Sequence, residues 1–157
     1  MDEEESLFPD DIDDDLDDVL EDDDEEEVIG YKPAPYFDTQ SGDFLLNGSG
    51  QIITADEVSA YIQWCENVIS TDRYNHSAYS DDIGIDYDDI FNAEDKDEAE
   101  SIIESEISEA LDCDPYGRTL YVQNVDVEWI GPDEANVHID IVALDNELVS
   151  VDTVIKK

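Results

Sequence analysis

The chain has 157 residues, of which 47 are Asp or Glu and only 6 are Lys or Arg, so its formal net charge at pH 7 is −41. Binding to nucleic-acid phosphates or to anionic membranes is therefore not expected, because both need Lys and Arg to neutralise the partner. An acidic body instead fits basic protein partners, mimicry of a nucleic acid, or a high-salt environment.

The negative charge is densest at the start of the chain, where the first 27 residues hold 18 carboxylates and no Lys or Arg. Like-charge repulsion and a small apolar area prevent such a segment from folding alone. We predict that residues 1–30 form a disordered acidic tail that folds on binding, with a purely solvating tail as the alternative. Apolar residues near helical spacing are its predicted anchors to a partner: Leu7, Phe8, Ile12 and Leu16.

Residues 31–35 contain two prolines and are predicted to be a linker without regular structure. The folded domain is expected over residues 36–157. It opens with a predicted β-hairpin, in which residues 44–46 and 51–53 flank an Asn-Gly-Ser-Gly turn.

Two helices are predicted from apolar residues that recur with helical spacing. The first begins with Thr54 and Glu57 as a capping box and continues to about residue 70. The second covers about 95–112 and ends before Pro115. Residues 71–92, between them, show no sustained period and predict a packed, aromatic loop.

The last third of the chain alternates between apolar and polar residues, which is typical of strands. The predicted core-facing sets are Tyr121, Gln123, Val125, Val127 and Trp129 in the first strand, Val137, Ile139, Ile141 and Ala143 in the second, and Val149, Val151, Thr153 and Ile155 in the third. The chain is therefore predicted to be a small single α+β domain with an N-terminal hairpin, two helices and a C-terminal three-stranded antiparallel meander. Its third strand is predicted to be an exposed edge, blunted only by two lysines, to which a partner strand adds. The predicted contact residues there are Val149, Val151, Thr153 and Ile155.

No catalytic residue, metal site or cofactor is predicted. The segment 112–117 has acids and a glycine at calcium-loop positions, but Gln123 stands where the bidentate Glu belongs. The two histidines and two cysteines match no zinc spacing, so Cys65 and Cys113 are predicted to be reduced, buried thiols. A carboxylate pair for hydrolysis stays open, because so many acids are present.

Arg73 is one of two arginines and lies close to Tyr74 and Tyr79 in the sequence. It is either a local ion-pair and helix-dipole partner or a keystone that holds the 71–92 loop through bidentate bonds to a carboxylate. We favour the keystone, and assign Arg73, Tyr74 and Tyr79 a structural role.

Several short motifs resemble phage proteins of the PBSX-type baseplate group, which are similar to the phage T4 baseplate wedge protein that initiates the sheath. One motif is the Leu-Phe-Pro opening at 7–9. The others lie within residues 71–91: Thr-Asp-Arg-Tyr at 71–74, Tyr-Ser at 79–80, Ile-Gly at 83–84 and Ile-Phe at 90–91. The predicted order of helix, aromatic loop, helix and three strands also resembles that group. The resemblance covers about residues 36–157 and the short opening. Better-known members carry a Glu-Pro-Arg triplet at their wedge contact, and this chain has none.

The resemblance implies a structural role without enzymatic activity. Six copies would surround the tail tube at the baseplate of a contractile phage tail or related injection system, contact wedge proteins, and template the first sheath ring by sharing β-strands with the sheath subunit. Assembly in the host cytoplasm and a place in the virion tail or injection particle follow from it. The alternatives from the residues alone are an acidic DNA-mimic inhibitor and a carboxylate-pair hydrolase.

Overall fold

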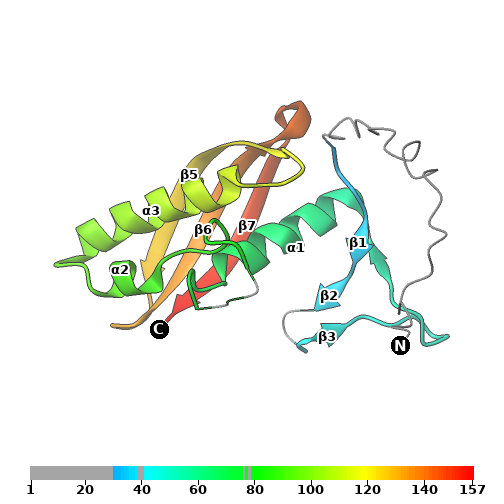
Figure 1. Ribbon diagram of the computed structural model, residues 1–157, viewed down its shortest axis with the longest axis horizontal. Helices are drawn as coiled ribbons and strands as arrows, with labels where there is room; N and C mark the ends of the chain where they lie inside the picture. Colours follow the sequence, from blue (N-terminus) through cyan, green and yellow to red (C-terminus); the bar gives the residue numbers. More distant parts are fainter. Residues whose placement is uncertain (1–29, 39–40, 76, 78) are drawn as a thin grey trace, which may run out of the picture.

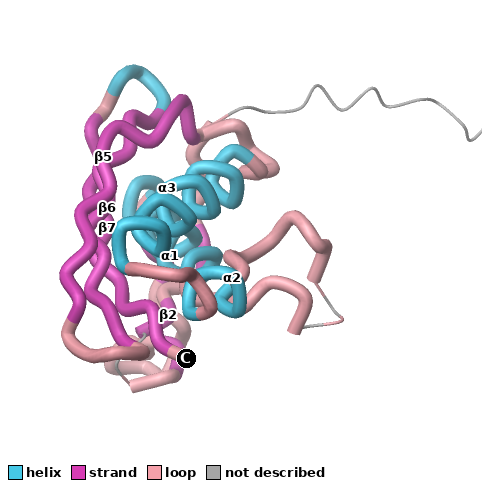
Figure 2. The backbone as a smooth tube through the Cα atoms, turned by 90° about the vertical axis from the view of Figure 1, so that its left-hand side faces the viewer, coloured by secondary structure: helices cyan, strands magenta, loops and turns pink. Residues whose placement is uncertain are grey.

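A computed structural model describes residues 30–38, 41–75, 77 and 79–157 of the chain. Residues 1–29 of the predicted acidic tail, with its anchors Leu7, Phe8, Ile12 and Leu16, lie outside these residues. The described part has two layers: a three-stranded sheet, and helices packed on one of its faces (Figures 1 and 2). The predicted α+β class is confirmed.

The helices begin at aspartates that cap them. They are α1 (Glu57–Ile69), α2 (Tyr87–Phe91) and α3 (Lys96–Asp112). In each, the preceding Asp accepts a hydrogen bond from the backbone N–H three residues on, and the oxygen–nitrogen distances are 2.7–3.1 Å. A carboxylate at this place satisfies an otherwise unpaired N–H and complements the positive end of the helix dipole. The caps are Asp56, Asp86 and Asp95.

Two helix predictions need correction. The capping box at Thr54 and Glu57 is wrong, because the backbone of Thr54 pairs with Pro35 in a strand and Asp56 takes the N-cap position. The short α2 was missed within the segment predicted as a loop. Five residues are too few to show a helical period, so only the cap and tertiary packing define this turn.

The sheet is the predicted C-terminal meander. It consists of β5 (Thr119–Trp129), β6 (Glu134–Ala143) and β7 (Leu148–Lys156), antiparallel and in the order β5-β6-β7. The short 3₁₀ turn η2 (Leu144–Asn146) joins the last two strands. The predicted inward faces of β6 and β7 are confirmed, because these residues are buried: Val137, Ile139, Ile141, Ala143, Val149, Val151 and Ile155.

The inward face of β5 is predicted correctly only for its second half. Val125, Val127 and Trp129 pack against the core, but Tyr121 is 57 % exposed and Val122 takes the inward position. The reason is two register shifts against β6, between Thr119 and Tyr121 and between Val122 and Asn124. Each extra residue in β5 changes whether odd- or even-numbered side chains face the core. A strict alternation along the sequence therefore cannot predict the inward face of the whole strand.

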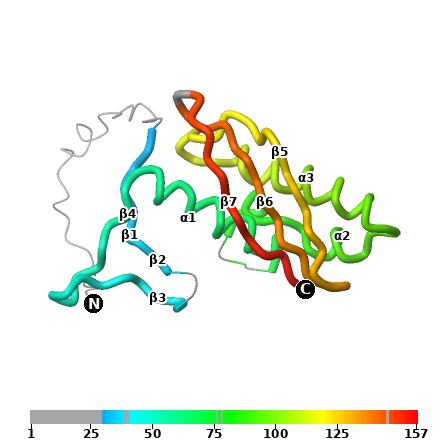
Figure 3. The backbone as a smooth tube through the Cα atoms, turned by 180° about the vertical axis from the view of Figure 1, so that it is seen from behind, coloured from blue at the N-terminus to red at the C-terminus, as the bar shows by residue number. Residues whose placement is uncertain are grey.

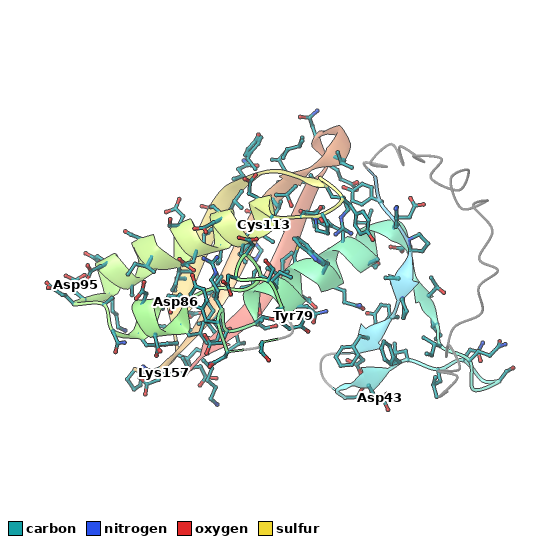
Figure 4. All side chains as sticks on the ribbon, in the orientation of Figure 1. Asp43, Tyr79, Asp86, Asp95, Cys113 and Lys157 are labelled. Carbon is teal, nitrogen blue, oxygen red and sulfur yellow. The ribbon has the colours of Figure 1, made fainter. Side chains whose placement is uncertain are left out.

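The hydrophobic core lies between the sheet and the helices, with α1 packed against β7 and α3 against β5. Cys65 is buried in it, as predicted. The same prediction is wrong for Cys113, which caps the exposed C-terminal end of α3 (Figure 4).

A β-structure that we call the arm (residues 34–38 and 41–55) precedes α1 and stands beside it (Figure 1). It contains β1 (Ala34–Pro35), β2 (Phe37–Asp38), β3 (Asp43–Phe44) and β4 (Thr54–Ala55), with β1 paired to β4 and β2 to β3. The predicted hairpin is confirmed by the bridge between Leu46 and Ile52. The prediction that the prolines of residues 31–35 exclude regular structure is wrong, because Pro35 pairs with Thr54.

Candidate functional site

The outer edge of β7 is the best candidate for binding a partner. No other strand of the described residues pairs with it, and Figure 3 shows β7 as the outermost strand of the sheet on the side of the arm. Its pairing with β6 runs without a register shift from Glu134–Lys156 to Val142–Leu148. A long, regular edge presents a row of backbone donors and acceptors to which another strand can add.

The hydrogen bonds at both ends of β7 show which residues face the edge. Ala143 N–H donates to the Glu147 carbonyl over 2.8 Å, and Lys157 N–H donates to the Asp133 carbonyl over 3.1 Å. Antiparallel pairs alternate between bonded and non-bonded, so the odd-numbered residues of β7 direct their N–H and C=O groups to β6. The outward backbone groups therefore belong to the even-numbered residues Leu148, Ser150, Asp152, Val154 and Lys156.

The predicted partner-binding residues of β7 are all odd-numbered, so their backbone groups bond to β6 and do not face the open edge. The side chains of Val149, Val151 and Ile155 are buried in the core, and Thr153 is half-buried. A strand that adds to this edge would bind the backbone of the even-numbered residues, while the odd-numbered ones hold β7 in place. The contact set itself remains a prediction.

The opposite edge of the sheet is less suitable. β5 contains both register shifts, and extra residues in a strand bend it and increase its twist. Such irregularity is a common protection against strand addition. The regular edge of β7 is therefore the stronger candidate.

The outward face of the sheet carries a small ionic cluster beside this edge. His138 Nδ1 lies 2.7 Å from Asp152 Oδ1, and its Nε2 lies 3.4 Å from Asp140 Oδ1. The hydrogen bond that Asp152 accepts from the His138 ring, together with the negative charges of Asp152, Asp140 and Asp126, raises the pKa of His138. The cluster pairs the side chain of Asp152, the single carboxylate of β7, with the His138 imidazole and leaves the backbone of Asp152 at the edge.

Arg73 joins the 71–92 loop to α3. Its Nε donates to the Gly84 carbonyl over 3.0 Å, its Nη1 to Glu109 over 3.2 Å, and its Nη2 lies 3.6 Å from Glu106. The guanidinium is thus shared among three residues, and the predicted bidentate bond to one carboxylate is wrong. The loop backbone is tied in the same place, since Arg73 N–H donates to the Ile85 carbonyl.

The other loop residues that were assigned a structural role lie differently. Tyr74 has a positive φ of 70° and is 65 % exposed, and Tyr79 is 54 % exposed. Tyr79 is labelled in Figure 4. Gly84 adopts φ 96°, and a Cβ there would lie 2.5 Å from the carbonyl oxygen of Thr71. The close backbone approach at Gly84 and the buried Arg73 are therefore the stronger determinants of this loop.

We expect Arg73→Lys to lower the free energy of unfolding by about 1–3 kcal/mol, because one ammonium cannot reach Gly84, Glu106 and Glu109 together. Urea unfolding of the purified protein, followed by circular dichroism, measures the change. Lys156→Arg, at an exposed position, serves as a control and should leave stability within about 0.5 kcal/mol. Equal stability of Arg73→Lys and the parent protein would show that Arg73 is not a keystone.

Sequence reasoning missed a second arginine site, at the start of β5. Arg118 is buried and donates from Nε and Nη2 to Asp114 over 2.9 and 2.7 Å. Its guanidinium lies 4.9–5.2 Å from three ring centroids, those of Tyr61, Trp64 and Tyr116. The sequence carries the signal as Asp114 four residues before Arg118. Asp114 belongs to the segment 112–117, which was considered only as a calcium loop.

The described part of the chain contains no group of three or more His, Cys, Asp or Glu residues that could hold a metal ion. Burial raises the pKa of the Cys65 thiol to about 12, so this thiol stays neutral and unreactive at ordinary pH. Among the described residues, no helix is long and apolar enough to cross a membrane.

Comparison with known families gives a match over residues 35–143, to the contractile injection system sheath initiators. The chain belongs to this family. The match spans the arm, the helices and the first two strands of the sheet, and thus most of the described domain. Comparison with curated proteins gave no match. The sheath initiator has a structural role in the baseplate of a contractile injection system.

Proposed function

We propose that this sheath initiator templates the first sheath ring by strand addition to β7. The observation that carries the proposal is the regular, outward-facing backbone of β7, in a chain of the sheath-initiator family. Each added strand would gain main-chain hydrogen bonds at positions 148–156 and continue the sheet of the initiator into the sheath subunit.

The finer assembly belongs to the same proposal. Six copies surround the tail tube at the baseplate, each in contact with a sheath subunit and with wedge proteins, as in the PBSX-type and phage T4 proteins that the sequence resembles. The particle is a phage tail or a related injection system that is assembled in the host cytoplasm. The sheath initiator has no catalytic role in it, and the match to a structural family gives no support to a DNA mimic or a hydrolase.

Deletion of the sheath initiator tests the proposed function directly. A particle-producing strain without it is expected to make baseplates and tubes but at least tenfold fewer sheathed tails, because sheath subunits then lack the strand edge on which the first ring forms. Negative-stain electron microscopy counts the sheathed and bare tubes. Re-expression of the intact chain must restore sheathing, and normal sheathed tails in the deletion strain would contradict the proposal.

The acidic tail is proposed to bind a wedge protein, with the apolar anchors supplying most of the affinity. Phe8→Ala is expected to weaken the binding of the full chain to the purified wedge about tenfold at every salt concentration, since burial of apolar area does not depend on screening. Neutralising Asp22, Asp23 and Asp24 to Asn should weaken binding mainly at low salt. Titration calorimetry at two salt concentrations separates the two contributions.

The matched control is Leu120→Ala, an apolar truncation at an exposed position of β5. It should leave wedge binding unchanged. A chain that starts at residue 31 and still joins the baseplate with full affinity would reduce the tail to a solvating appendage.

A further inference from the structure

The arm has an exposed apolar surface that strand addition at β7 does not explain. Residues 44–55 form a run of twelve without a charged side chain, in a chain of which 34 % is charged. Every residue from 41 to 54 is nevertheless exposed. The exposed fractions of its large apolar side chains are between 37 and 57 %: Tyr36, Phe44, Leu45, Leu46, Ile52 and Ile53.

An apolar hairpin of this kind is unusual on the surface of a protein that otherwise repels its neighbours by charge. Two-stranded hairpins are marginally stable in water, and contiguous exposed apolar side chains mark interaction sites. Solubility alone would favour Lys, Glu or Thr here. The composition therefore indicates a surface that is covered in the assembly.

Contacts within the arm hold its turn and join its strands. Asn47 closes its turn, because its Oδ1 accepts hydrogen bonds from the backbone of Ser49 and Gln51 over 2.9 and 3.0 Å. Phe37 and Phe44 contact each other edge to face, with ring centroids 5.4 Å apart. A surface held in this way loses little conformational entropy on binding.

Contacts to α1 fix the direction of the arm. Gln63 accepts a hydrogen bond from Phe37 N–H over 2.8 Å and donates to the Pro35 carbonyl over 3.2 Å. Between the arm and α1 runs a groove lined by residues of both: Tyr36, Phe37, Asp38, Ser59, Ile62, Gln63 and Glu66. Tyr36 belongs both to the lining of this groove and to the exposed apolar side chains of the arm.

The charges around this surface indicate the chemistry of its partner. No Lys or Arg occurs between Lys32 and Arg73, whereas Asp38 and Asp43 lie in the arm and Asp56 and Glu57 follow it in the sequence. Figure 4 shows Asp43 at the end of the arm. Glu66, half-buried in the groove, has no ion pair among the described residues, and burial together with Asp152 raises its pKa. A complementary surface would be apolar with a rim of Lys or Arg.

We propose that the arm docks onto an apolar, basic-rimmed patch of a baseplate protein other than the sheath subunit. A second copy of this chain is disfavoured, because the same acids would meet across the contact. The sheath subunit is assigned to the β7 edge. Only residues 31–33 separate the arm from the acidic segment that is proposed to bind the wedge, so one basic surface of a partner can contact both. This inference rests on the proposed place of the chain in the baseplate.

Photo-crosslinking in the assembled particle tests the proposal. A benzophenone amino acid at Leu46 should crosslink to a baseplate protein, at an apolar peptide that contains Lys or Arg. The same group at Val154, on the β7 edge, should reach the sheath subunit instead. Crosslinks from Leu46 to the sheath or to another copy, or none at all, would overturn the docking proposal. Failure at Val154 alone would overturn strand addition and leave the arm proposal standing.

A second measurement needs no variant. Diazirine labelling of the unmodified protein should modify Leu46 and Ile52 at least fivefold less in the particle than in the isolated chain. Equal labelling would show that the arm stays exposed after assembly. In addition, the double variant Leu46→Ser and Ile52→Ser should enter particles at least tenfold less often, whereas the control Leu120→Ser and Tyr121→Ser, equally exposed on β5, should enter normally.

Discussion

Proline at Val154 is expected to abolish sheath assembly on the tube and to leave the isolated domain folded. The N–H of Val154 points to the open edge of β7, so proline there removes a donor that the domain itself does not use. The ring also projects into the space that an added strand must occupy. Sheathed tails, counted by electron microscopy in a strain that makes only the variant, should fall at least tenfold, as in the deletion.

Proline at Thr153 is the matched comparison one residue away. Its N–H belongs to the ladder with β6, so the substitution removes an internal hydrogen bond and should lower the free energy of unfolding by about 3 kcal/mol or more. The two variants therefore fail for different reasons, which circular dichroism of the purified proteins distinguishes. A folded Val154→Pro protein that supports normal sheathing would rule out strand addition at this edge.

Elements with a regular period were predictable from the sequence. The alternation in β6 and β7 and the apolar face of α3 give the layers, the meander and most of the core, because burial of one face requires these periods. The two lysines at the end of β7 were enough to predict an edge strand. They do not show which residues of β7 direct their backbone N–H and C=O groups to the open edge. That follows from the hydrogen bonds at Glu147 and Lys157.

Elements defined by tertiary contacts were not predictable in the same way. The register shifts of β5 depend on its pairing with β6, and the arm depends on backbone pairing between residues that are about 20 apart in the sequence. In the candidate site, the sequence drew attention to Arg73 because it stands among aromatic residues. The role of Arg118 was not predicted, because its aromatic partners Tyr61 and Trp64 come from a helix far away in the sequence.

The Asp114–Arg118 pair is expected to give the largest loss of stability on substitution. Both side chains are nearly inaccessible to solvent, with exposed fractions of 1 and 4 %. Asp114 also accepts a hydrogen bond from the backbone N–H of Arg118 over 2.7 Å. Removing one member of a buried pair leaves the other charge uncompensated, so Asp114→Asn should lower the free energy of unfolding by about 3–5 kcal/mol.

A double-mutant cycle in urea separates the pair from its surroundings. Arg118→Met keeps a long apolar stem against Tyr61 and Trp64, so the double variant with Asp114→Asn should be less destabilised than the sum of the two single changes, by about 1–3 kcal/mol. Asp112→Asn, an exposed acid two residues earlier, is the control and should stay within about 0.5 kcal/mol of the parent protein. Additive losses would mean that the carboxylate acts only as a backbone cap. A strong coupling would identify the aromatic-lined ion pair as the contact that holds the start of β5 against Tyr61 and Trp64 of α1.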